Sequence, residues 1–145
     1  MENSMLFKVL VIDDDPNMTD LLSLLLKSRG YEVSICNSGR DGIQKTKADP
    51  QDVIILDMMM EEMDGLQVCA QIRTFSNIPI LILSALDNPG IIVKALDAGA
   101  DDFLTKPVSS GLLISRLNTL TRRVNGNDPG LKIPVFHSSD KNLIL

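Results

Sequence analysis

The chain has 145 residues, 44% of them hydrophobic and 23% charged, which is ordinary for one globular domain that buries a core without disulfides. Its formal net charge of −5 argues against nucleic-acid binding by this stretch itself. No apolar run reaches the ~20 residues that cross a bilayer, so we expect no membrane contact. Cys36 and Cys69 are isolated thiols, which favours the reducing cytoplasm over a disulfide or a zinc site.

Strand and helix patterns alternate five times along the chain. Apolar runs predict strands at residues 7–13, 31–36, 53–56, 78–83 and 103–104. Amphipathic patterns with Pro, Asp or Gly at their ends predict helices at residues 16–29, 39–47, 65–74, 89–98 and 109–124. Such alternation with short connections indicates an α/β fold, a parallel sheet with helices on both faces.

The composition changes after residue 124. Residues 125–130 read NGNDPG, which is typical of a linker, and residues 131–145 hold strand-like fragments too short to fold alone. We interpret residues 1–124 as one domain and residues 125–145 as a linker with the possible start of a truncated effector domain. A whole chain that ends in a floppy extension, and acts by protein contacts alone, is the alternative.

Three consecutive carboxylates follow the first strand, at Asp13, Asp14 and Asp15. Like charges about 4 Å apart repel by about 4 kcal/mol at an effective dielectric constant of ~20, so a cluster of them needs a reason. A helix cap explains one, since Asp15 precedes Pro16 as an N-cap precedes a proline at N1. For the other two a divalent cation is the better explanation, and adjacent hard oxygens suit Mg²⁺.

Polar side chains also end three later strands: Asp57 the third, Ser84 the fourth and Lys106 the fifth. Carboxyl ends of parallel strands share one edge of the sheet, where ligands bind in open α/β folds. The carboxylates suit a divalent cation, and the hydroxyl and ammonium suit phosphoryl oxygens. A strand-end Asp can also carry a phosphoryl group as an acyl phosphate.

The segments that carry these residues resemble the receiver domains of two-component response regulators. They are VLVIDDDP at 9–16, LDMMM at 56–60, MDG at 63–65, SA at 84–85 and AGADDFLTKP at 98–107. Each motif is weak alone, but their order at successive strand ends is specific. The resemblance covers about residues 5–124 and implies a flavodoxin-like (βα)5 sheet, doubly wound, with strand order 2-1-3-4-5.

The resemblance implies a role for each matching residue. Asp57 accepts a phosphoryl group from a sensor histidine kinase. Asp13, Asp14, Asp57 and the backbone carbonyl of Met59 hold Mg²⁺, with a water-mediated contact left open for Asp13. Ser84 and the Ala85 amide bind phosphoryl oxygens, Lys106 pairs with the phosphoryl group, and the Lys106–Pro107 bond is cis. Phe103 is either an aromatic switch that follows Ser84 or plain core. Such a domain assists its own phosphorylation and dephosphorylation and is otherwise no enzyme.

The chain departs from the family pattern at Glu61, where proline is common. We hypothesise that Glu61 or Glu62 reaches the metal through water and changes its affinity. The apolar Met59 and Leu86 border the path of an attacking water, which predicts slow dephosphorylation. Met58, Met59 and Met60 are otherwise interpreted as packing residues.

The resemblance also implies an output surface formed by the fourth helix, fifth strand and fifth helix. Its charges resemble the dimer face of regulators that carry a winged-helix DNA-binding domain: Lys94, Asp97, Asp101, Asp102, Arg116, Arg122 and Arg123. We therefore expect a homodimer through this surface, and DNA contact only through a missing effector domain. Solvated charges that do nothing measurable are the alternative. Ile92 and Leu112 stand where that subgroup often has a salt-bridged pair, so an apolar contact is expected there.

Two other functions fit part of the pattern. A haloacid-dehalogenase-type phosphatase also uses a strand-end Asp, Mg²⁺, a hydroxyl and a Lys. Its acidic pair follows the Lys, however, whereas Asp101 and Asp102 precede Lys106. A degenerate receiver that binds partners without phosphorylation is disfavoured because the acidic set is intact.

Overall fold

The computed structural model describes residues 6–124, and the predictions for residues 125–145 lie outside that range. Five parallel strands form one sheet in the order β2-β1-β3-β4-β5. The strands are β1 (Lys8–Ile12), β2 (Glu32–Cys36), β3 (Val53–Asp57), β4 (Ile80–Ser84) and β5 (Asp102–Thr105). The helices are α1 (Pro16–Ser28), α2 (Gly39–Ala48), α3 (Gly65–Arg73), α4 (Pro89–Asp97) and α5 (Ser110–Val124). The predicted flavodoxin-like fold is confirmed.

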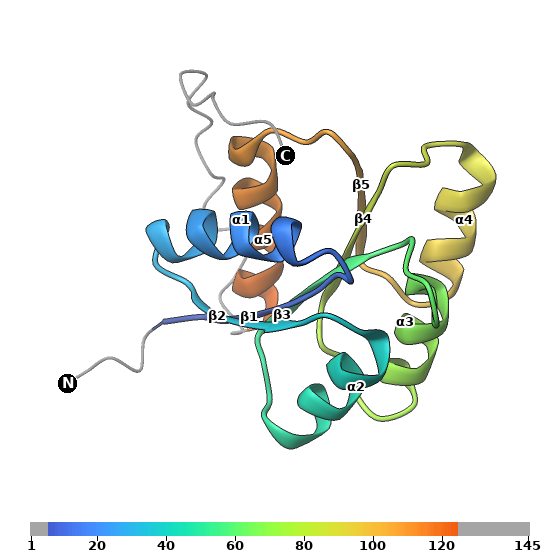
Figure 1. Ribbon diagram of the computed structural model, residues 1–145, viewed down its shortest axis with the longest axis horizontal. Helices are drawn as coiled ribbons and strands as arrows, with labels where there is room; N and C mark the ends of the chain where they lie inside the picture. Colours follow the sequence, from blue (N-terminus) through green and yellow to red (C-terminus); the bar gives the residue numbers. More distant parts are fainter. Residues whose placement is uncertain (1–5, 125–145) are drawn as a thin grey trace.

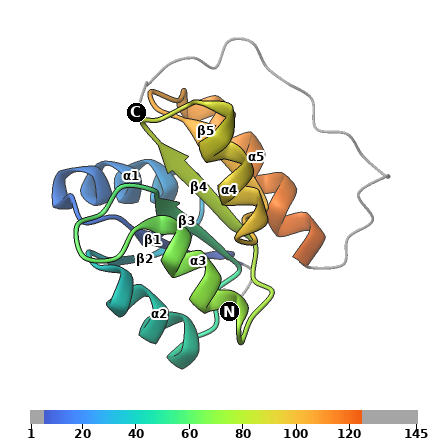
Figure 2. The same cartoon turned by 90° about the vertical axis from the view of Figure 1, so that its right-hand side faces the viewer.

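Helices cover both faces of the sheet. Helices α1 and α5 lie on one face, and α2, α3 and α4 lie on the other (Figures 1 and 2). Each face has its own core: the first core lies under α1 and α5, and the second lies under α2, α3 and α4. Successive residues of β1 alternate between them, with Val9 and Val11 in the first core and Leu10 and Ile12 in the second. Burial on both faces explains why the inner strands are apolar throughout. Within residues 6–124, no helix has the length and apolarity needed to cross a membrane.

The helix ends follow the local chemistry of the sequence. The Asp15 side chain caps α1 by accepting a hydrogen bond from the Asn17 N–H at 3.0 Å. Gly30 ends the same helix with φ at 92°, a conformation that only glycine adopts readily. Asp64 forms a capping box with Gln67 at the start of α3. The two N-caps fix where the carboxyl-edge loops after β1 and β3 end, whereas Gly30 lies at the opposite edge of the sheet, before β2.

The predicted packing role of three methionines is wrong for one of them. Met58 is buried and Met60 packs partly against the second core, but the Met59 side chain is 55% exposed. The chain leaves the sheet after Asp57, so the coverage on both faces that buries every residue of β3 ends there. Met59 consequently lies on the open side of the loop that follows β3.

Candidate functional site

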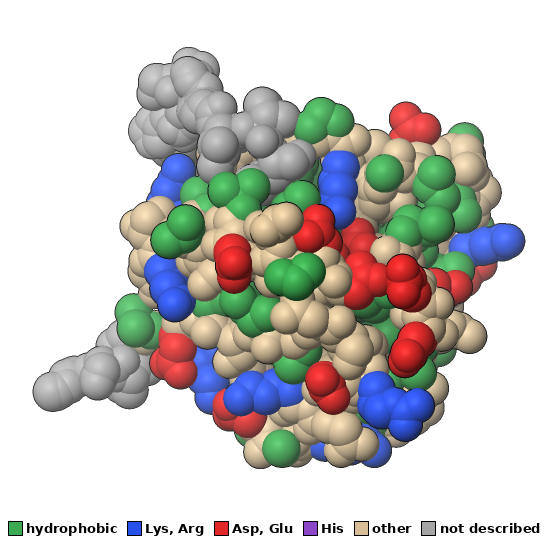
Figure 3. All heavy atoms as spheres, in the orientation of Figure 1, with side chains coloured by type: hydrophobic (Ala, Val, Ile, Leu, Met, Phe, Trp, Pro, Cys, Tyr) green, Lys and Arg blue, Asp and Glu red, His purple; other side chains and the backbone are tan. Residues whose placement is uncertain are grey.

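Three carboxylates meet at the carboxyl edge of the sheet. Ile12 pairs with Leu56 in register, so the residues after these two positions emerge side by side. Asp13, Asp14 and Asp57 each offer an oxygen within 4.8 Å of the others. Acidic side chains visibly gather on this edge (Figure 3). The set provides three hard oxygen ligands, the kind that Mg²⁺ prefers.

The ammonium of Lys106 lies among these carboxylates. Its Nζ is 3.1 Å from Oδ1 of Asp57 and 3.8 Å from Oδ2 of Asp13. The Lys106 backbone N–H donates to the Ser84 carbonyl at 2.8 Å, and the bond to Pro107 is cis, as predicted. The strand end and the following turn therefore hold the lysine at the site.

Burial sets the electrostatics of the two inner carboxyl groups. Removal from water is the main cause that raises the pKa of Asp13 to about 6; the neighbouring Asp57 charge also raises this pKa, and a hydrogen bond from the Asp15 N–H opposes the rise. Burial likewise raises the pKa of Asp57, and Lys106 opposes that rise. One ammonium does not neutralise three carboxylates, so the site favours an additional cation.

Ser84 ends the strand that lies between those of Asp57 and Lys106. Its side chain is fully buried, and its Oγ accepts a hydrogen bond from the Leu86 N–H at 2.9 Å. Phe103 pairs with Ile82 in register and packs partly buried against the second core. Ser84 and Phe103 thus belong to the same face of the sheet, while Ala85 follows Ser84 on the exposed side of the strand end.

The sequence reasoning missed two residues that shape this site. Asn37 donates from Nδ2 to the carbonyl of Asp13 at 2.8 Å and to Oγ1 of Thr19 at 3.2 Å, which ties the end of β1 to the loop after β2. Gly65 packs against the end of β3, where an added Cβ would lie 2.7 Å from the carbonyl oxygen of Asp57. Asn37 lies 24 residues from Asp13, and the atoms that crowd Gly65 belong to the end of β3 and to Met58, so no local pattern signals either contact.

The surface of α4, β5 and α5 combines paired charges with exposed apolar side chains. Arg116 contacts both carboxylate oxygens of Asp102 at 2.8 Å, and Arg73 pairs with Asp101 at 2.8 Å. The apolar side chains of this surface include Val93, Leu96 and Leu112, which are 55%, 47% and 40% exposed. Ile92 is half-buried, Lys94 and Asp97 are exposed, and the Arg123 side chain lies outside what the structure describes.

Comparison with known proteins identifies the family. The model of the response regulator receiver domain matches residues 9–118, and the chain belongs to this family of two-component signalling proteins. That assignment favours a receiver over the haloacid-dehalogenase alternative.

Named relatives agree with the family assignment. The chain is 38% identical over 137 residues to response regulator MprA of Mycolicibacterium vanbaalenii, covering 94% of this chain and 59% of that protein. It is 39% identical over 132 residues to response regulator MprA of Mycobacterium leprae, covering 90% of this chain and 58% of that protein. The chain therefore spans less than two thirds of the length of these relatives.

Solved receiver structures have the same architecture. The receiver domain of the Francisella response regulator 1452 superposes with a TM-score of 0.77 at 35% identity, covering 81% of this chain and 98% of that one. The BeF3-activated DrrB receiver domain superposes with a TM-score of 0.75 at 28% identity, covering 82% and 100%.

Proposed function

We propose that the protein is a phosphorylation-dependent signalling receiver whose phosphoacceptor is Asp57. The observation that carries this proposal is the ammonium of Lys106 at 3.1 Å from the Asp57 carboxylate, with two further carboxylates beside it. A carboxylate oxygen of Asp57 attacks the phosphorus of a phosphohistidine on a sensor histidine kinase. The P–N bond breaks, its electron pair stays with the imidazole, and Asp57 carries the phosphoryl group as an acyl phosphate.

The donor set fits a magnesium ion. Asp13, Asp14, Asp57 and the backbone carbonyl of Met59 would hold it, and a bound Mg²⁺ supplies positive charge that offsets the phosphoryl oxygens and the carboxylates. The chain contributes positioning and charge of its own. Lys106 offers its ammonium to the phosphoryl group.

The groups that follow β4 complete the expected phosphoryl site. In the present structure the Ser84 Oγ accepts the Leu86 N–H, which leaves its own hydroxyl proton to donate to a phosphoryl oxygen. The Ala85 N–H is the second donor in this proposal. Movement of Ser84 toward the phosphoryl group vacates space on the face of the sheet shared with Phe103, which we propose as the switch residue.

Incubation with acetyl phosphate and MgCl₂, followed by intact mass measurement, tests the proposal. We expect the wild type to gain one phosphoryl group and Asp57→Ala to gain none. Asp20→Ala is the matched control, because it removes an exposed carboxylate from α1 and leaves the site intact. Phosphorylation of Asp57→Ala to the wild-type extent would refute the assignment.

We further propose that phosphorylation switches the surface of α4, β5 and α5 and thereby controls a homodimer. Exposed Val93 and Leu96 provide the apolar contact, in keeping with the absence of a charged pair at Ile92 and Leu112. Sedimentation of the phosphorylated protein tests this. Leu96→Asp should abolish dimerisation, whereas Leu24→Asp, at a 71% exposed position on α1, should not. Equal dimerisation of both variants would exclude this surface.

The wider role follows from the resemblance to regulators with a winged-helix domain. We propose a cytoplasmic regulator in which residues 125–145 are the linker to an effector domain and the start of that domain, and in which the effector domain, not the receiver, binds DNA. The net charge of −5 supports the proposal that the receiver itself does not bind DNA, because an acidic surface repels the DNA phosphates. Titration of labelled duplex DNA with this chain should show no binding at physiological salt.

A further inference from the structure

The loop between β3 and α3 reaches across the candidate cation site. It is closed at its base, where the Gly65 N–H donates to the Met58 carbonyl at 2.9 Å. The capping box of Asp64 and Gln67 fixes the same end. The tip of the loop, residues 60–63, forms one wall of a cavity of about 180 Å³ whose other wall is the loop before α2. The cavity therefore separates part of the tip from the start of α2, although Met63 lies close to Gly39.

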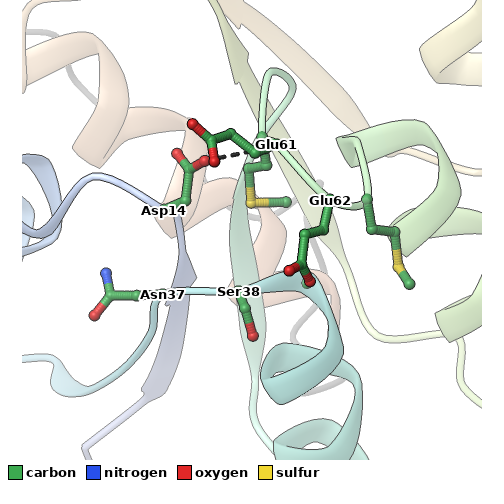
Figure 4. A pocket seen from close by; sticks show the side chains of 8 residues that line it. Asp14, Asn37, Ser38, Glu61 and Glu62 are labelled. Carbon is green, nitrogen blue, oxygen red and sulfur yellow. Dashed lines mark hydrogen bonds between the residues drawn. The ribbon is translucent and has the colours of Figure 1, made fainter.

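One hydrogen bond joins the tip of this loop to the acidic site. The backbone N–H of Glu61 donates to Oδ2 of Asp14 at 3.1 Å. Figure 4 shows this bond at the upper edge of the cavity, with the Glu61 side chain extending toward Asp14 and the Glu62 side chain pointing away toward Ser38. The bond spans 47 residues of sequence and holds a carboxylate that no core packing fixes.

This bond has a consequence for cation binding. An ionised carboxylate has two oxygens with about four acceptor positions, so Asp14 can accept the Glu61 N–H and still offer an oxygen to a cation. Metal-ligating carboxylates are commonly oriented by such donors, which spare the cation the entropy cost of fixing the ligand. The interaction uses the backbone N–H, so every residue type except proline can supply it at position 61.

We propose that Glu61 is a positioning residue of the divalent-cation site and acts through its backbone N–H on the carboxylate of Asp14. The proposal rests on the proposed function, because it takes Asp13, Asp14 and Asp57 as the cation ligands. The Glu61 carboxylate is the smaller contributor, since an exposed charge beside the site is screened by water and salt.

Calorimetric titration of the unphosphorylated protein with MgCl₂ separates the backbone from the side chain. Glu61→Ala keeps the N–H and removes the carboxylate, whereas Glu61→Pro removes both. We expect Glu61→Pro to bind Mg²⁺ about tenfold more weakly than the wild type, the loss typical of a removed ligand-orienting contact. Glu61→Ala should stay within about threefold, as expected for loss of one screened surface charge. Equal affinities of the two variants would overturn the proposal.

A double-mutant cycle shows whether the effect passes through Asp14. Urea unfolding in EDTA is measured for Asp14→Ala, Glu61→Pro and the double variant. We expect Glu61→Pro to destabilise the protein clearly less when residue 14 is alanine, because the bond is already lost. Additive effects would mean that proline acts on the shape of the loop, and would refute the proposal.

Amide hydrogen exchange provides a test that needs no proline variant. The Glu61 amide should exchange several-fold faster in Asp14→Ala than in the wild type, and an unchanged rate would contradict the bond.

Acetyl phosphate labelling of the same samples distinguishes failure of this inference from failure of the proposed function. If the wild type is phosphorylated but Glu61→Ala and Glu61→Pro bind Mg²⁺ equally, only the present inference is refuted. If the wild type binds no Mg²⁺ and takes up no phosphoryl group, the proposed function is refuted as well.

Discussion

The Nζ atom of Lys106 lies 3.1 Å from Oδ1 of Asp57, although 49 residues separate the two in the chain. The contact exists because β3, β4 and β5 are neighbours in a parallel sheet, so their carboxyl ends open on one edge. The contact lowers the pKa of the Asp57 carboxyl group, whereas burial raises that pKa. The lysine therefore favours the ionised form of the proposed phosphoacceptor against the effect of burial, and it also lies beside the charge that a phosphoryl group brings.

Replacement of Lys106 by methionine should impair phosphorylation in a pH-dependent way. Loss of one charge-assisted hydrogen bond should slow phosphorylation by acetyl phosphate by about tenfold or more at pH 7. The pKa of Asp57 should rise further, because its opposing cation is gone. As the pH falls, Asp57 of the variant should therefore become protonated, and phosphorylation should be lost, at a higher pH than in the wild type. Intact mass after fixed incubation times across a pH series gives both quantities, and identical pH profiles would contradict the pairing.

The raised pKa of Asp13 predicts how stability changes with pH in the absence of a divalent cation. A carboxyl group with a pKa of about 6 when folded binds its proton more tightly than in the unfolded chain, where its pKa is about 3.9. Its stabilising contribution is therefore complete below pH ~4 and is lost as the pH rises toward about 6. At neutral pH the folded protein bears the cost of the buried charge.

Asp13→Asn removes that cost while it keeps the acceptor for the Asp15 N–H. In urea unfolding with EDTA at pH 7.5, the variant should be more stable than the wild type by about 2–3 kcal/mol. The two proteins should be equally stable near pH 4. Added MgCl₂ should stabilise the wild type more than the variant. A stability difference that is the same at both pH values would show that burial of this charge is not its cause.

The sequence predicts the fold well because its signals are local. Short, β-branched apolar runs closed by Asp57 or Asp13 favour strands buried on two faces, and Asp15, Gly30 and Asp64 mark helix ends by their own chemistry. Strand ends also predict which side chains share an edge, and Asp13, Asp14, Asp57 and Lys106 lie together in the structure.

What the sequence does not predict depends on contacts between remote loops. The bond from the Glu61 N–H to Asp14 uses a backbone atom that every residue except proline has, so no residue type signals it. The exposure of Met59 depends on where β3 ends and the chain turns, and hydrophobicity alone predicted burial. Gly65 looked like an ordinary helix start, because the backbone that crowds it comes from another element.

Gly65 should tolerate no side chain. An alanine Cβ would lie 2.7 Å from the Asp57 carbonyl oxygen and 2.9 Å from the Cα of Met58, and these backbone atoms cannot rotate away. Gly65→Ala should therefore destabilise the protein by roughly 1–3 kcal/mol, as overpacking does, and reduce phosphorylation. Gly90→Ala is the matched control at a helix start, since its nearest neighbour is a side-chain oxygen of Asn88 at 3.3 Å. Equal effects of both substitutions in urea unfolding would contradict the steric argument.

Tyr31 offers a spectroscopic test of the α1–α5 side of the core. The side chain is 6% exposed, its hydroxyl donates to Oδ1 of Asn118 at 2.7 Å, and burial raises its pKa to about 12. It is the sole tyrosine and the chain has no tryptophan, so tyrosinate absorbance reports this residue alone. The midpoint in the folded protein should lie near 12. Because the folded chain binds this proton more tightly, stability should fall between pH ~10 and about 12. A midpoint near 10 would show that the hydroxyl is solvated.

Two exposed apolar side chains beside the proposed phosphoacceptor predict slow loss of the phosphoryl group. Met59 lies two residues after Asp57 and Leu86 two residues after Ser84, and they are 55% and 39% exposed. Neither can orient or deprotonate an attacking water, as hydrolysis of an acyl phosphate requires. Met59→Asn supplies a polar group at the same place and should speed dephosphorylation by roughly tenfold through better positioning of water. Leu24→Asn, at a 71% exposed position on α1, is the control that should leave the rate unchanged. The phosphorylated fraction, followed by intact mass after removal of acetyl phosphate, should fall over many minutes in the wild type, and a half-life of seconds would refute this account.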